Sequence, residues 1–443
     1  MNKPNRLRYG IVGAGAAGLT LAWHLARSGH EVVIYERERG LGGLASDIPF
    51  GNTKIDRFYH HIFNSDTTVQ KFAELTGLTS KLHWCESSVG FEHQGRLYPF
   101  TKPTHLLRFS PLSLFSRFRT GLAILRMGRQ DDYLPLESIT AEQYIIQTMG
   151  EQAYRVLWEP LLRSKFGDRY RDVSAVWFWG KVKLRGGTRS KKTGGEILGY
   201  MQDGWGQLYD RMGETVIERG AELRTGQLVR KIGRVEGSGR LWIKTRSGVE
   251  EYDRVIVTPS VPSFLKMVDD LPEDYRASVS QIPYQANITM ILGVERSLSP
   301  YYWLNITSPD SPFVAVIEHT NLFQDPNYGG MVPIYLSRYL SEDHPLYKSP
   351  MREVKAGFLN YLQRVFPQFD PDALQHFTFS KALYTQPVIG LHYSKKRPSF
   401  ETPLPNLYLC TMVQIYPEDR GQNYSMKMAE TLLSHLDEPL HDR

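Results

Sequence analysis

The stretch YGIVGAGAAGLTLAWHLARSGHEVVIYE, residues 9–36, decides the fold of this chain. It opens with an apolar run at 9–12 that predicts a buried strand, and a glycine-rich turn follows at 13–18. Apolar side chains then recur at helical spacing over 16–28, and a second strand is predicted at 31–35. A strand, glycine turn, helix and strand in this order are typical of a unit that binds a dinucleotide.

The glycines and the helix start have separate physical roles in such a unit. Gly13 allows the tight turn, Gly15 lets a pyrophosphate approach the backbone, and Gly18 lets helix and strand pack closely. The N–H groups that open the helix, at Ala16 and Ala17, favour a bound anion because they lack an intrahelical acceptor. We therefore predict that this turn contacts the phosphates of a nucleotide; a glycine-rich turn without a ligand is the alternative.

An acidic residue and a second glycine pair follow the second strand. Glu36 stands at the strand end, where it can accept both hydroxyls of a ribose. Arg37 comes next, and the pair Gly42-Gly43 is followed by Leu44. All of these residues are predicted to line the nucleotide site.

The ribose acid with its glycine pair resembles the extended motif of flavoproteins that have two dinucleotide-binding domains. The chain is similar to the superfamily of amine oxidases, protoporphyrinogen oxidases and phytoene desaturases, and to UDP-galactopyranose mutase. The resemblance implies FAD as the cofactor, with Gly42-Gly43 close to its pyrophosphate. Many amine oxidases carry Arg after the pair, where this chain has Leu44, and this departure counts against a strict amine oxidase.

The resemblance also implies the fold class and the domain organisation. It predicts an α/β fold in which an FAD-binding, Rossmann-like domain is interleaved with an α+β substrate domain, over a chain of 443 residues. The predicted FAD-binding segments are 1–90, 201–262 and 391–443. The predicted substrate segments are 91–200, which is largely helical, and 263–390, which contains an antiparallel sheet.

A histidine pair opens the block HHIFNSD at 60–66. Together with the hairpin sequence GRLYPF at 95–100, this block is similar to the N-terminal part of UDP-galactopyranose mutase. In the mutase the histidine of this motif lies beside the flavin ring, so the resemblance implies a catalytic role for His61 and a cofactor contact for His60. A packed or capping histidine is the alternative for both. No third ligand accompanies them, so no metal site is predicted.

Helix signals and basic residues mark the region that follows. Asp66 is the predicted cap of a helix at 66–78. A second predicted helix, 110–128, carries arginines opposite a row of Leu and Phe. It would lie in a membrane interface or cover the substrate domain with a solvated face, and the second interpretation is favoured. A glycine-rich loop is expected to carry Lys181, Lys183, Arg185, Arg189, Lys191 and Lys192, which would hold a substrate phosphate or face solvent.

Two later segments are expected to return to the cofactor, as they do in the superfamily. A strand near Val229 is implied to contact the adenine through its backbone. A strand at 406–410, a loop and a helix from 424 follow. The resemblance places the start of this helix at the pyrimidine end of the flavin. The expected contacts there are Asp419, Gly421, Gln422 and Asn423.

Composition narrows the classes of protein that remain. The 25 Tyr, 20 Phe and 8 Trp suit a globular protein with an aromatic-lined cavity. Two cysteines, Cys85 and Cys410, offer neither a disulfide framework nor metal-ligand spacing, which favours a cytoplasmic location. The polar N-terminus predicts no signal peptide, and no apolar run is long enough to span a membrane.

The chain is basic, with a formal net charge of +6 and a pI of about 9.0. This charge favours a phosphorylated ligand or peripheral contact with an anionic membrane; a plain solvated surface is the equal alternative. No nucleic-acid-binding motif accompanies it, so no nucleic-acid partner is predicted.

Three functions are compatible with these features. The first is an FAD-dependent oxidoreductase that takes a hydride from a small-molecule substrate held in an aromatic cavity over the flavin. The second is a mutase-like isomerase that acts on a nucleotide- or lipid-linked sugar with reduced FAD. The third is a carrier resembling the Rab escort and GDP-dissociation-inhibitor proteins, which Glu36 and Gly42-Gly43 oppose. Oxidation is the favoured prediction; substrate, electron acceptor and oligomeric state stay open.

Overall fold

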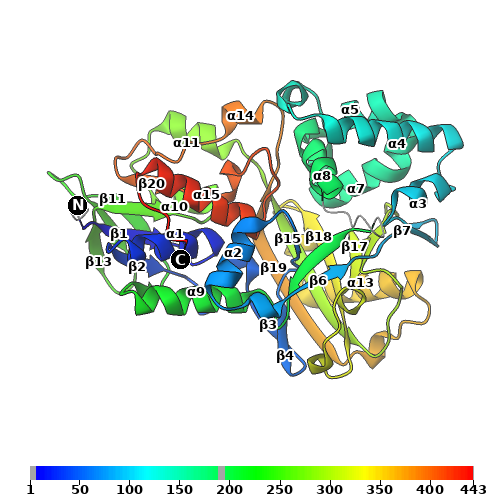
Figure 1. Ribbon diagram of the computed structural model, residues 1–443, viewed down its shortest axis with the longest axis horizontal. Coiled ribbons are helices and arrows are strands. Elements are labelled where there is room, and N and C mark those ends of the chain that lie inside the picture. Colours follow the sequence, from blue (N-terminus) through cyan, green and yellow to red (C-terminus); the bar gives the residue numbers. More distant parts are fainter. Residues whose placement is uncertain (1–5, 188–194, 443) are drawn as a thin grey trace.

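A parallel sheet of five strands forms the centre of one half of the molecule (Figure 1). The structure is a computed structural model that describes residues 6–187 and 195–442. The strand order is β10-β2-β1-β14-β20, and every pairing is parallel. The strands are β1 (Arg8–Val12), β2 (Glu31–Tyr35), β10 (Glu222–Arg224), β14 (Arg254–Val257) and β20 (Leu407–Leu409). Segments from both ends of the chain therefore meet in one layer.

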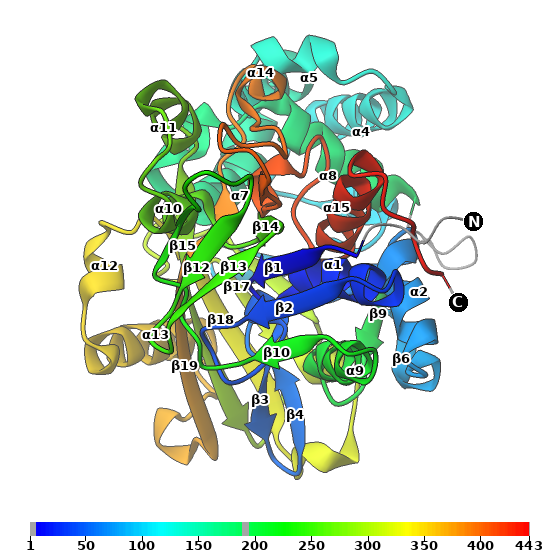
Figure 2. The same ribbon diagram turned by 90° about the vertical axis from the view of Figure 1, so that its left-hand side faces the viewer.

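Different structures cover the two faces of this sheet (Figure 2). Helices α1 (Ala16–Arg27), α9 (Gly206–Glu218) and α15 (Gln422–His435) pack together over one face. The antiparallel strands β11 (Lys231–Arg234), β12 (Leu241–Lys244) and β13 (Val249–Tyr252) cover the other. They lie so close to β1 that a Cβ on Gly10 would come within 2.6 Å of Ile243 and 3.0 Å of Tyr252. The strand–turn–helix–strand unit predicted at 9–36 and the α/β fold are confirmed.

A mixed sheet of seven strands forms the other half, with the order β19-β15-β18-β17-β16-β7-β8. Its strands are β7 (Val89–His93), β8 (Arg96–Pro99), β15 (Tyr284–Val294), β16 (Trp303–Ile306), β17 (Ala315–Glu318), β18 (Val332–Leu340) and β19 (His376–Pro387). Helix α13 (Met351–Val365) packs on it through Val354, Phe358 and Leu362. The parallel pairing of β7 with β16 was not predicted, because it joins strands far apart in sequence. The boundaries of the interleaved domains remain a prediction.

A helical layer lies beside the larger sheet, at the upper right of Figure 1. It comprises α3 (Pro103–Arg108), α4 (Leu114–Arg129), α5 (Ala141–Met149), α6 (Glu151–Ala153), a π-helical turn (Tyr154–Trp158), α7 (Glu159–Phe166) and α8 (Ala175–Gly187). Helix α8 continues through Lys181, Lys183 and Arg185, so these residues lie on a helix and not in the expected loop. Arg189, Lys191 and Lys192 lie outside the described residues.

Small sheets and short helices connect the two halves. Strands β5 (Ile62–Phe63), β9 (Ile197–Met201) and β6 (Leu82–Glu86) form one sheet, and β3 (Asp47–Phe50) and β4 (Thr53–Asp56) form another. The remaining short helices are α10 (Val261–Met267), α11 (Glu273–Ser280), α12 (Pro345–Lys348) and α14 (Tyr393–Lys396).

Helix α2 (Thr67–Leu75) begins where the sequence predicts, but a different residue bonds its first turn. The Asp66 side chain accepts a hydrogen bond from the Phe63 N–H and not from the helix. The Asn423 Oδ1 instead accepts from the N–H groups of Thr68 and Val69, at 3.0 and 3.2 Å. Asp66 is the N-cap residue, as predicted, but its side chain does not bond the helix, and Asn423 of the C-terminal helix accepts from the first turn instead.

Gly18 provides a test of how tightly α1 must pack. A Cβ at this position would lie 1.9 Å from the carbonyl oxygen of Gly13, which is backbone and cannot rotate away. We expect Gly18→Ala to lower the free energy of unfolding by roughly 2–3 kcal/mol, measured by urea denaturation followed by circular dichroism.

The matched control is Gly357→Ala in α13, where an added Cβ meets nothing within 4 Å. This change should be neutral or should stabilise the protein by up to about 1 kcal/mol. Equal stability of Gly18→Ala and the wild-type protein would show that α1 can move away from the turn without cost.

Candidate active site

The turn before α1 is open toward an external anion. Gly13 has a φ of +99° and donates its N–H to the Tyr35 carbonyl at 2.8 Å. Gly15 is the N-cap of α1, where no side chain caps the helix and no acidic residue lies in the first turn. The N–H groups at Ala16, Ala17 and Gly18 therefore begin a helix whose first turn carries no acidic side chain, which leaves these donors open to an anion.

The second glycine pair lies against this turn. Gly15 and Gly42 form a parallel bridge, and the Gly42 N–H donates to the Ala14 carbonyl at 2.9 Å. Gly42 and Gly43 have φ values of +89° and +59°, and Leu44 follows in a short 3₁₀ helix, Gly43–Ala45. The structure thus brings together two loops that are expected to share one pyrophosphate.

Glu36 directly follows β2, the position from which the sequence predicts a contact with the ribose. Its side chain is only 7% exposed, and its two carboxylate oxygens accept from the N–H groups of Ala14 at 2.8 Å and Glu38 at 2.9 Å. A carboxylate has further lone pairs, so these bonds leave capacity for hydroxyl donors. Arg37 is exposed, with its Nε 3.3 Å from Glu38 Oε1.

Val229 is buried but does not lie in a strand. Strand β11 begins at Lys231, so the strand expected near Val229 starts later than predicted. The preceding segment is still anchored beside the nucleotide unit, because the Gln227 N–H donates to the Glu36 carbonyl at 2.8 Å. The expected adenine contact would therefore come from coil backbone.

The start of α15 is linked to the second glycine pair through one tyrosine. A Cβ on Gly42 would lie 2.7 Å from the Tyr209 ring, and the Tyr209 hydroxyl donates to Gln422 Oε1 at 2.7 Å. Gly421 is the N-cap of α15, again without a side-chain cap. The Nε2 of Gln422 is buried without a partner among the described residues, which leaves a donor for a bound group. The Asn423 side chain is committed to α2.

The histidine pair lies between β4 and β5, and its members have different surroundings. The His60 Nδ1 contacts the Phe58 carbonyl oxygen, and burial lowers the pKa of His60 to about 4 with a smaller contribution from Arg420. The His60 ring is therefore neutral at pH 7. The Nδ1 of His61 lies 3.1 Å from the Tyr302 hydroxyl, and its ring centroid lies 6.3 Å from that of Trp303.

Aromatic side chains that sequence reasoning did not single out surround these histidines. The ring centroids of Tyr59 and Trp303 are 4.9 Å apart, and those of Tyr59 and Tyr335 are 6.2 Å apart. Burial and the neighbouring Tyr339 raise the pKa of Tyr59 well above its usual value, so its hydroxyl keeps its proton. Only the abundance of aromatic residues signalled this cluster in the sequence.

Three cationic side chains, Lys165, Lys181 and Arg420, lie near Tyr339 and Asp419. The Asp419 carboxylate pairs with Lys181 and lies 3.5 Å from the Nζ of Lys165. Burial opposes ionisation of Asp419, but these cations and Arg420 outweigh it and hold the pKa of the carboxyl well below its usual range. Asp419, which was expected to contact the flavin, is thus engaged by lysines from α7 and α8.

Arg420 is a further residue that the sequence analysis did not predict as part of the site. Its Nη2 donates to the Tyr339 hydroxyl at 3.0 Å and to Gln386 Oε1 at 3.3 Å. Its Nε is buried without a partner among the described residues. Its position next to the predicted Asp419 was the available signal, but burial of the guanidinium depends on β18 and β19.

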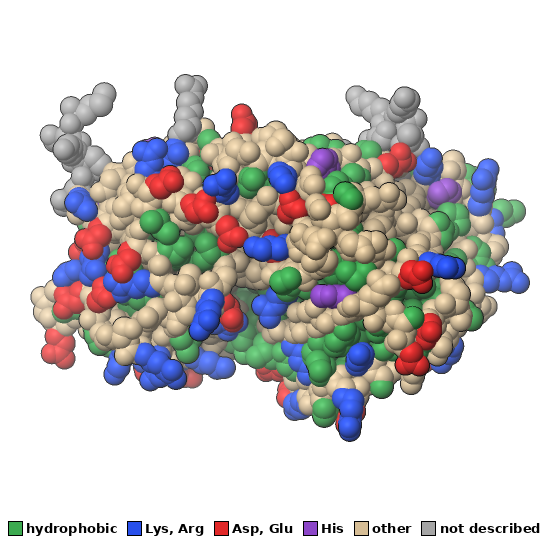
Figure 3. All heavy atoms as spheres, turned by 90° about the horizontal axis from the view of Figure 1, so that it is seen from below, with side chains coloured by type: hydrophobic (Ala, Val, Ile, Leu, Met, Phe, Trp, Pro, Cys, Tyr) green, Lys and Arg blue, Asp and Glu red, His purple; other side chains and the backbone are tan. Residues whose placement is uncertain are grey.

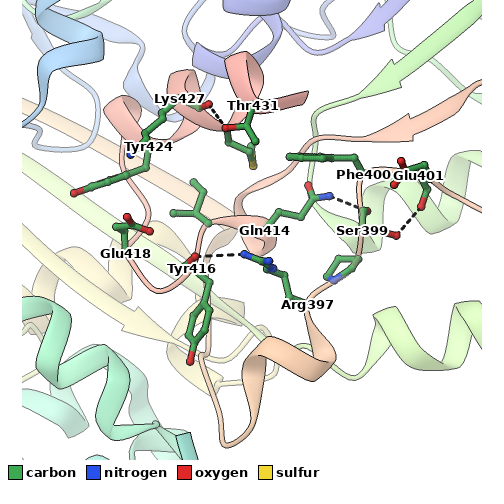
Figure 4. A pocket seen from close by; sticks show the side chains of 13 residues that line it. Arg397, Ser399, Phe400, Glu401, Gln414, Tyr416, Glu418, Tyr424, Lys427 and Thr431 are labelled. Carbon is green, nitrogen blue, oxygen red and sulfur yellow. Dashed lines mark hydrogen bonds between the residues drawn. The ribbon is translucent and has the colours of Figure 1, made fainter. Parts of the chain in front are cut away.

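A separate cavity of about 300 Å³ lies between α15 and the segment before β20 (Figure 4). Arg397, Ser399 and Gln414 lie on one side of it, and Tyr424 and Lys427 of α15 lie on the other. None of the described residues predicted to bind the cofactor lines this cavity. The predicted residues converge elsewhere, at the turn before α1 and at the N-terminus of α15.

In the part of the chain that the structure describes, the hydrogen-bond donors without a protein acceptor at these two helix starts could bind the phosphates and the ring system of a dinucleotide. The uncapped start of α1 suits a pyrophosphate, and the Gln422 Nε2, which has no partner among the described residues, suits a polar ring edge. Fold and site together define a flavoprotein of the class with two dinucleotide-binding domains.

The profile of the family described as "Flavin containing amine oxidoreductase" matches residues 16–413, and the chain belongs to this family. The predicted relationship and the predicted cofactor, FAD, are confirmed, and the protein is an FAD-dependent oxidoreductase of this family.

Solved structures with the same fold cover nearly the whole chain. A candidate protoporphyrinogen oxidase from Exiguobacterium sp. 255-15 is 17% identical with a TM-score of 0.78, over 98% of this chain and 99% of that one. Reduced UDP-galactopyranose mutase is 16% identical with a TM-score of 0.76, over 98% and 97%. Cyclohexylamine oxidase from Brevibacterium oxydans IH-35A is 14% identical with a TM-score of 0.71, over 98% and 100%. At these identities the likeness shows the fold alone.

Curated relatives match only in part. The carotenoid phi-ring synthase of Streptomyces griseus is 28% identical over 188 residues, 38% of this chain and 36% of that protein. The match to the flavin-containing monooxygenase FMO GS-OX2 of Arabidopsis thaliana is 59% identical over 34 residues, 8% of this chain and 7% of that protein. The chain thus spans about a third or less of the relatives' length, so neither identifies its substrate.

The buried carboxylate of Glu36 provides a test of the nucleotide site. We expect Glu36→Ala to weaken FAD binding by about 10- to 100-fold, because a hydrogen-bonding charged acceptor is lost from a buried position. The measurement is fluorescence titration of the FAD-free protein with FAD.

The control is Glu38→Ala, since the Glu38 side chain is 59% exposed and its N–H, which Glu36 accepts, is retained. Its affinity for FAD should match that of the wild-type protein. An affinity of Glu36→Ala for FAD equal to that of the wild-type protein would remove Glu36 from the site.

Proposed function

We propose that this enzyme takes a hydride from an anionic small-molecule substrate held beside Tyr59, His61 and Trp303, and that Arg420 binds the acidic group of that substrate. Bound FAD would supply the acceptor for the hydride. The observation that carries the proposal is the excess of positive charge next to the aromatic cluster.

Charge balance favours an anion over a protonated amine. Lys165, Lys181 and Arg420 lie around the carboxylate of Asp419, and both lysines are paired with it. An approaching cation would meet net positive charge in a partly buried setting, where Coulomb interactions are poorly screened. The unpartnered Nε of Arg420 remains available as a charged donor to an oxyanion.

The aromatic residues would position the rest of the substrate. Tyr59 and Trp303 meet edge to face at a centroid distance of 4.9 Å, which gives a rigid apolar wall. The hydrogen bond between His61 and Tyr302 holds the His61 ring in one orientation. His61 is thereby a positioned group that can hold or transfer a proton beside the substrate.

Isomerisation of a nucleotide- or lipid-linked sugar with reduced FAD is the second candidate. The cationic group formed by Lys165, Lys181 and Arg420 would suit a diphosphate as well as a carboxylate. The fold shared with reduced UDP-galactopyranose mutase supports this candidate without preferring it.

The experiment that separates the two candidates is anaerobic. The oxidised holoenzyme is mixed separately with carboxylate, phosphate and amine compounds, and with UDP-galactopyranose, while the flavin absorbance is recorded. Bleaching of the flavin by a substrate supports net oxidation. Conversion of UDP-galactopyranose only after reduction with dithionite, with the flavin still reduced at the end, would favour isomerisation. Rapid bleaching by amines alone would overturn the anionic substrate.

Arg420 should determine substrate affinity. Oxidised holoenzyme titrated with pyrophosphate should show a shift of the flavin spectrum, and Arg420→Gln should weaken this binding by at least about tenfold because a charged hydrogen bond is lost. The control is Arg397→Gln, which removes an exposed arginine that lines the separate cavity. Equal affinities of the Arg420→Gln and Arg397→Gln proteins would exclude Arg420 from the anion site.

His61 should affect turnover and not cofactor content. We expect His61→Ala to lower kcat by on the order of 100-fold, the usual contribution of a positioned proton-transfer group, with the substrate found by the anaerobic screen. FAD content, read from the absorbance spectrum, should stay at the wild-type value. The control is His435→Ala on the exposed end of α15. A kcat equal to that of the wild-type protein would leave His61 with a packing role only.

A further inference from the structure

Helix α4 buries mostly small and polar side chains and exposes large apolar ones, whereas an ordinary surface helix buries its apolar face. Its buried residues are Ser116, Thr120, Ala123 and Met127, mostly small or polar, and they face α5 and α8. Five of its large apolar residues point away from the protein. This exposed apolar face consists of Leu114, Phe115, Phe118, Leu122 and Leu125, which are between 49% and 75% exposed.

The spacing of these residues places them on one stripe of the helix. Positions 114, 118, 122 and 125 repeat at intervals of three and four, and Phe115 widens the stripe. Over 16 residues the helix is about 24 Å long, so the stripe is far larger than a single exposed leucine. Clustered exposed apolar surface of this kind marks an interaction site. In both ribbon views α4 lies at the periphery of the molecule (Figures 1 and 2).

The segment around α4, residues 101–130, is strongly basic. Residues 101–130 contain no Asp or Glu and carry six cations: Lys102, Arg108, Arg117, Arg119, Arg126 and Arg129. The whole chain has 53 Lys and Arg against 47 Asp and Glu, so this segment alone accounts for the formal net charge of +6. By contrast, charges of both signs are intermixed over the face seen in Figure 3.

The arginines divide into two groups. Arg119 donates to the carbonyls of Thr148 and Gln147 at the end of α5, and Arg117 donates to the carbonyls of Leu112 and Leu107. These bonds hold α4 in its orientation and keep its apolar face outward. Arg126 and Arg129 are exposed on the last turns of the helix, beside that face.

We infer that α4 docks this protein on a bilayer that contains anionic phospholipid, with the helix lying in the interface plane. Apolar side chains would enter the acyl region while Arg126 and Arg129 reach the phosphates. Among the described residues, no helix is long and apolar enough to cross a bilayer, so contact through α4 would be peripheral. The inference does not depend on the proposed substrate.

A second copy of the chain fits this face less well. Two copies meeting through α4 would bring Arg126 and Arg129 of both chains together, and residues 101–130 offer no acidic side chain to neutralise them. Like charges brought together at an interface oppose association. An anionic bilayer instead supplies both an apolar layer and a complementary charge.

The test is co-sedimentation of the FAD-loaded, full-length protein with sucrose-loaded vesicles. One set contains phosphatidylglycerol and phosphatidylcholine in about equal parts, and the other contains phosphatidylcholine alone. We expect at least about tenfold stronger partitioning into the anionic vesicles, which falls when NaCl is raised from about 0.1 M to about 1 M.

Two double variants separate the apolar and the electrostatic contributions. Phe115→Ser with Phe118→Ser, and Arg126→Glu with Arg129→Glu, should each lower partitioning into the anionic vesicles by at least about tenfold. The matched controls change exposed residues elsewhere: Ile217→Ser with Leu228→Ser for apolar surface, and Lys244→Glu with Arg246→Glu for charge. The controls should bind as the wild-type protein does. FAD content and the melting temperature, measured for every variant, show that the fold is intact.

Three outcomes would overturn the inference. They are failure of the wild-type protein to bind anionic vesicles, equal partitioning into both vesicle types, and unchanged binding by both α4 variants. Analytical ultracentrifugation tests the alternative that a second copy of the chain covers the exposed apolar face. A wild-type dimer that dissociates in the Phe115→Ser, Phe118→Ser protein would assign the apolar face to a second copy and not to a bilayer.

Discussion

The backbone contact between the two glycine loops is the constraint on which the rest of the site depends. The Gly42 N–H donates to the Ala14 carbonyl where the two loops meet, and a side chain at Gly42, which has a φ of +89°, would collide with the Tyr209 ring. This contact keeps the start of α1 accessible and brings the Tyr209 ring to within van der Waals range of Gly42. Tyr209 in turn bonds Gln422, so the C-terminal helix is positioned by the same contact.

The second organising feature is the burial of charge beside aromatic rings. Asp419 and Arg420 are adjacent in the chain, but Asp419 turns to lysines on α7 and α8 while Arg420 turns to β18 and β19. The helical layer and the larger sheet are therefore joined at one loop. In the proposed function this loop would select the charge of the substrate, because Arg420 is held by β18 and β19 while Asp419 holds the two lysines.

Helix α8 connects this loop to the surface helix α4. One part of α8 supplies Lys181 to the Asp419 pair, and another part packs on α4. A surface that binds a membrane would thus lie only one helix away from the cationic group. The Trp179 Nε1, which donates to the Gln130 carbonyl just after α4, ties the two helices together.

Local sequence was sufficient to predict those parts of the fold and of the candidate site that depend on backbone geometry. The unit at 9–36, the second glycine pair and Glu36 were predictable, because tight turns, helix starts and strand ends are set by nearest neighbours. Asp66 shows the limit: its helix was predicted, but the residue that bonds its first turn, Asn423, comes from the other end of the chain.

The residues of the proposed substrate site are brought together by the tertiary structure alone. Tyr59, Trp303, Tyr339 and Arg420 come from separate elements, and no local pattern records that β16, β18 and the loop before α15 meet. The exposure of α4 has the same origin, since its amphipathic sequence predicts two faces but not which of them is buried. The buried face of α4 is determined by the residues that pack against α5 and α8 and by the hydrogen bond from Arg119 to the backbone at the end of α5.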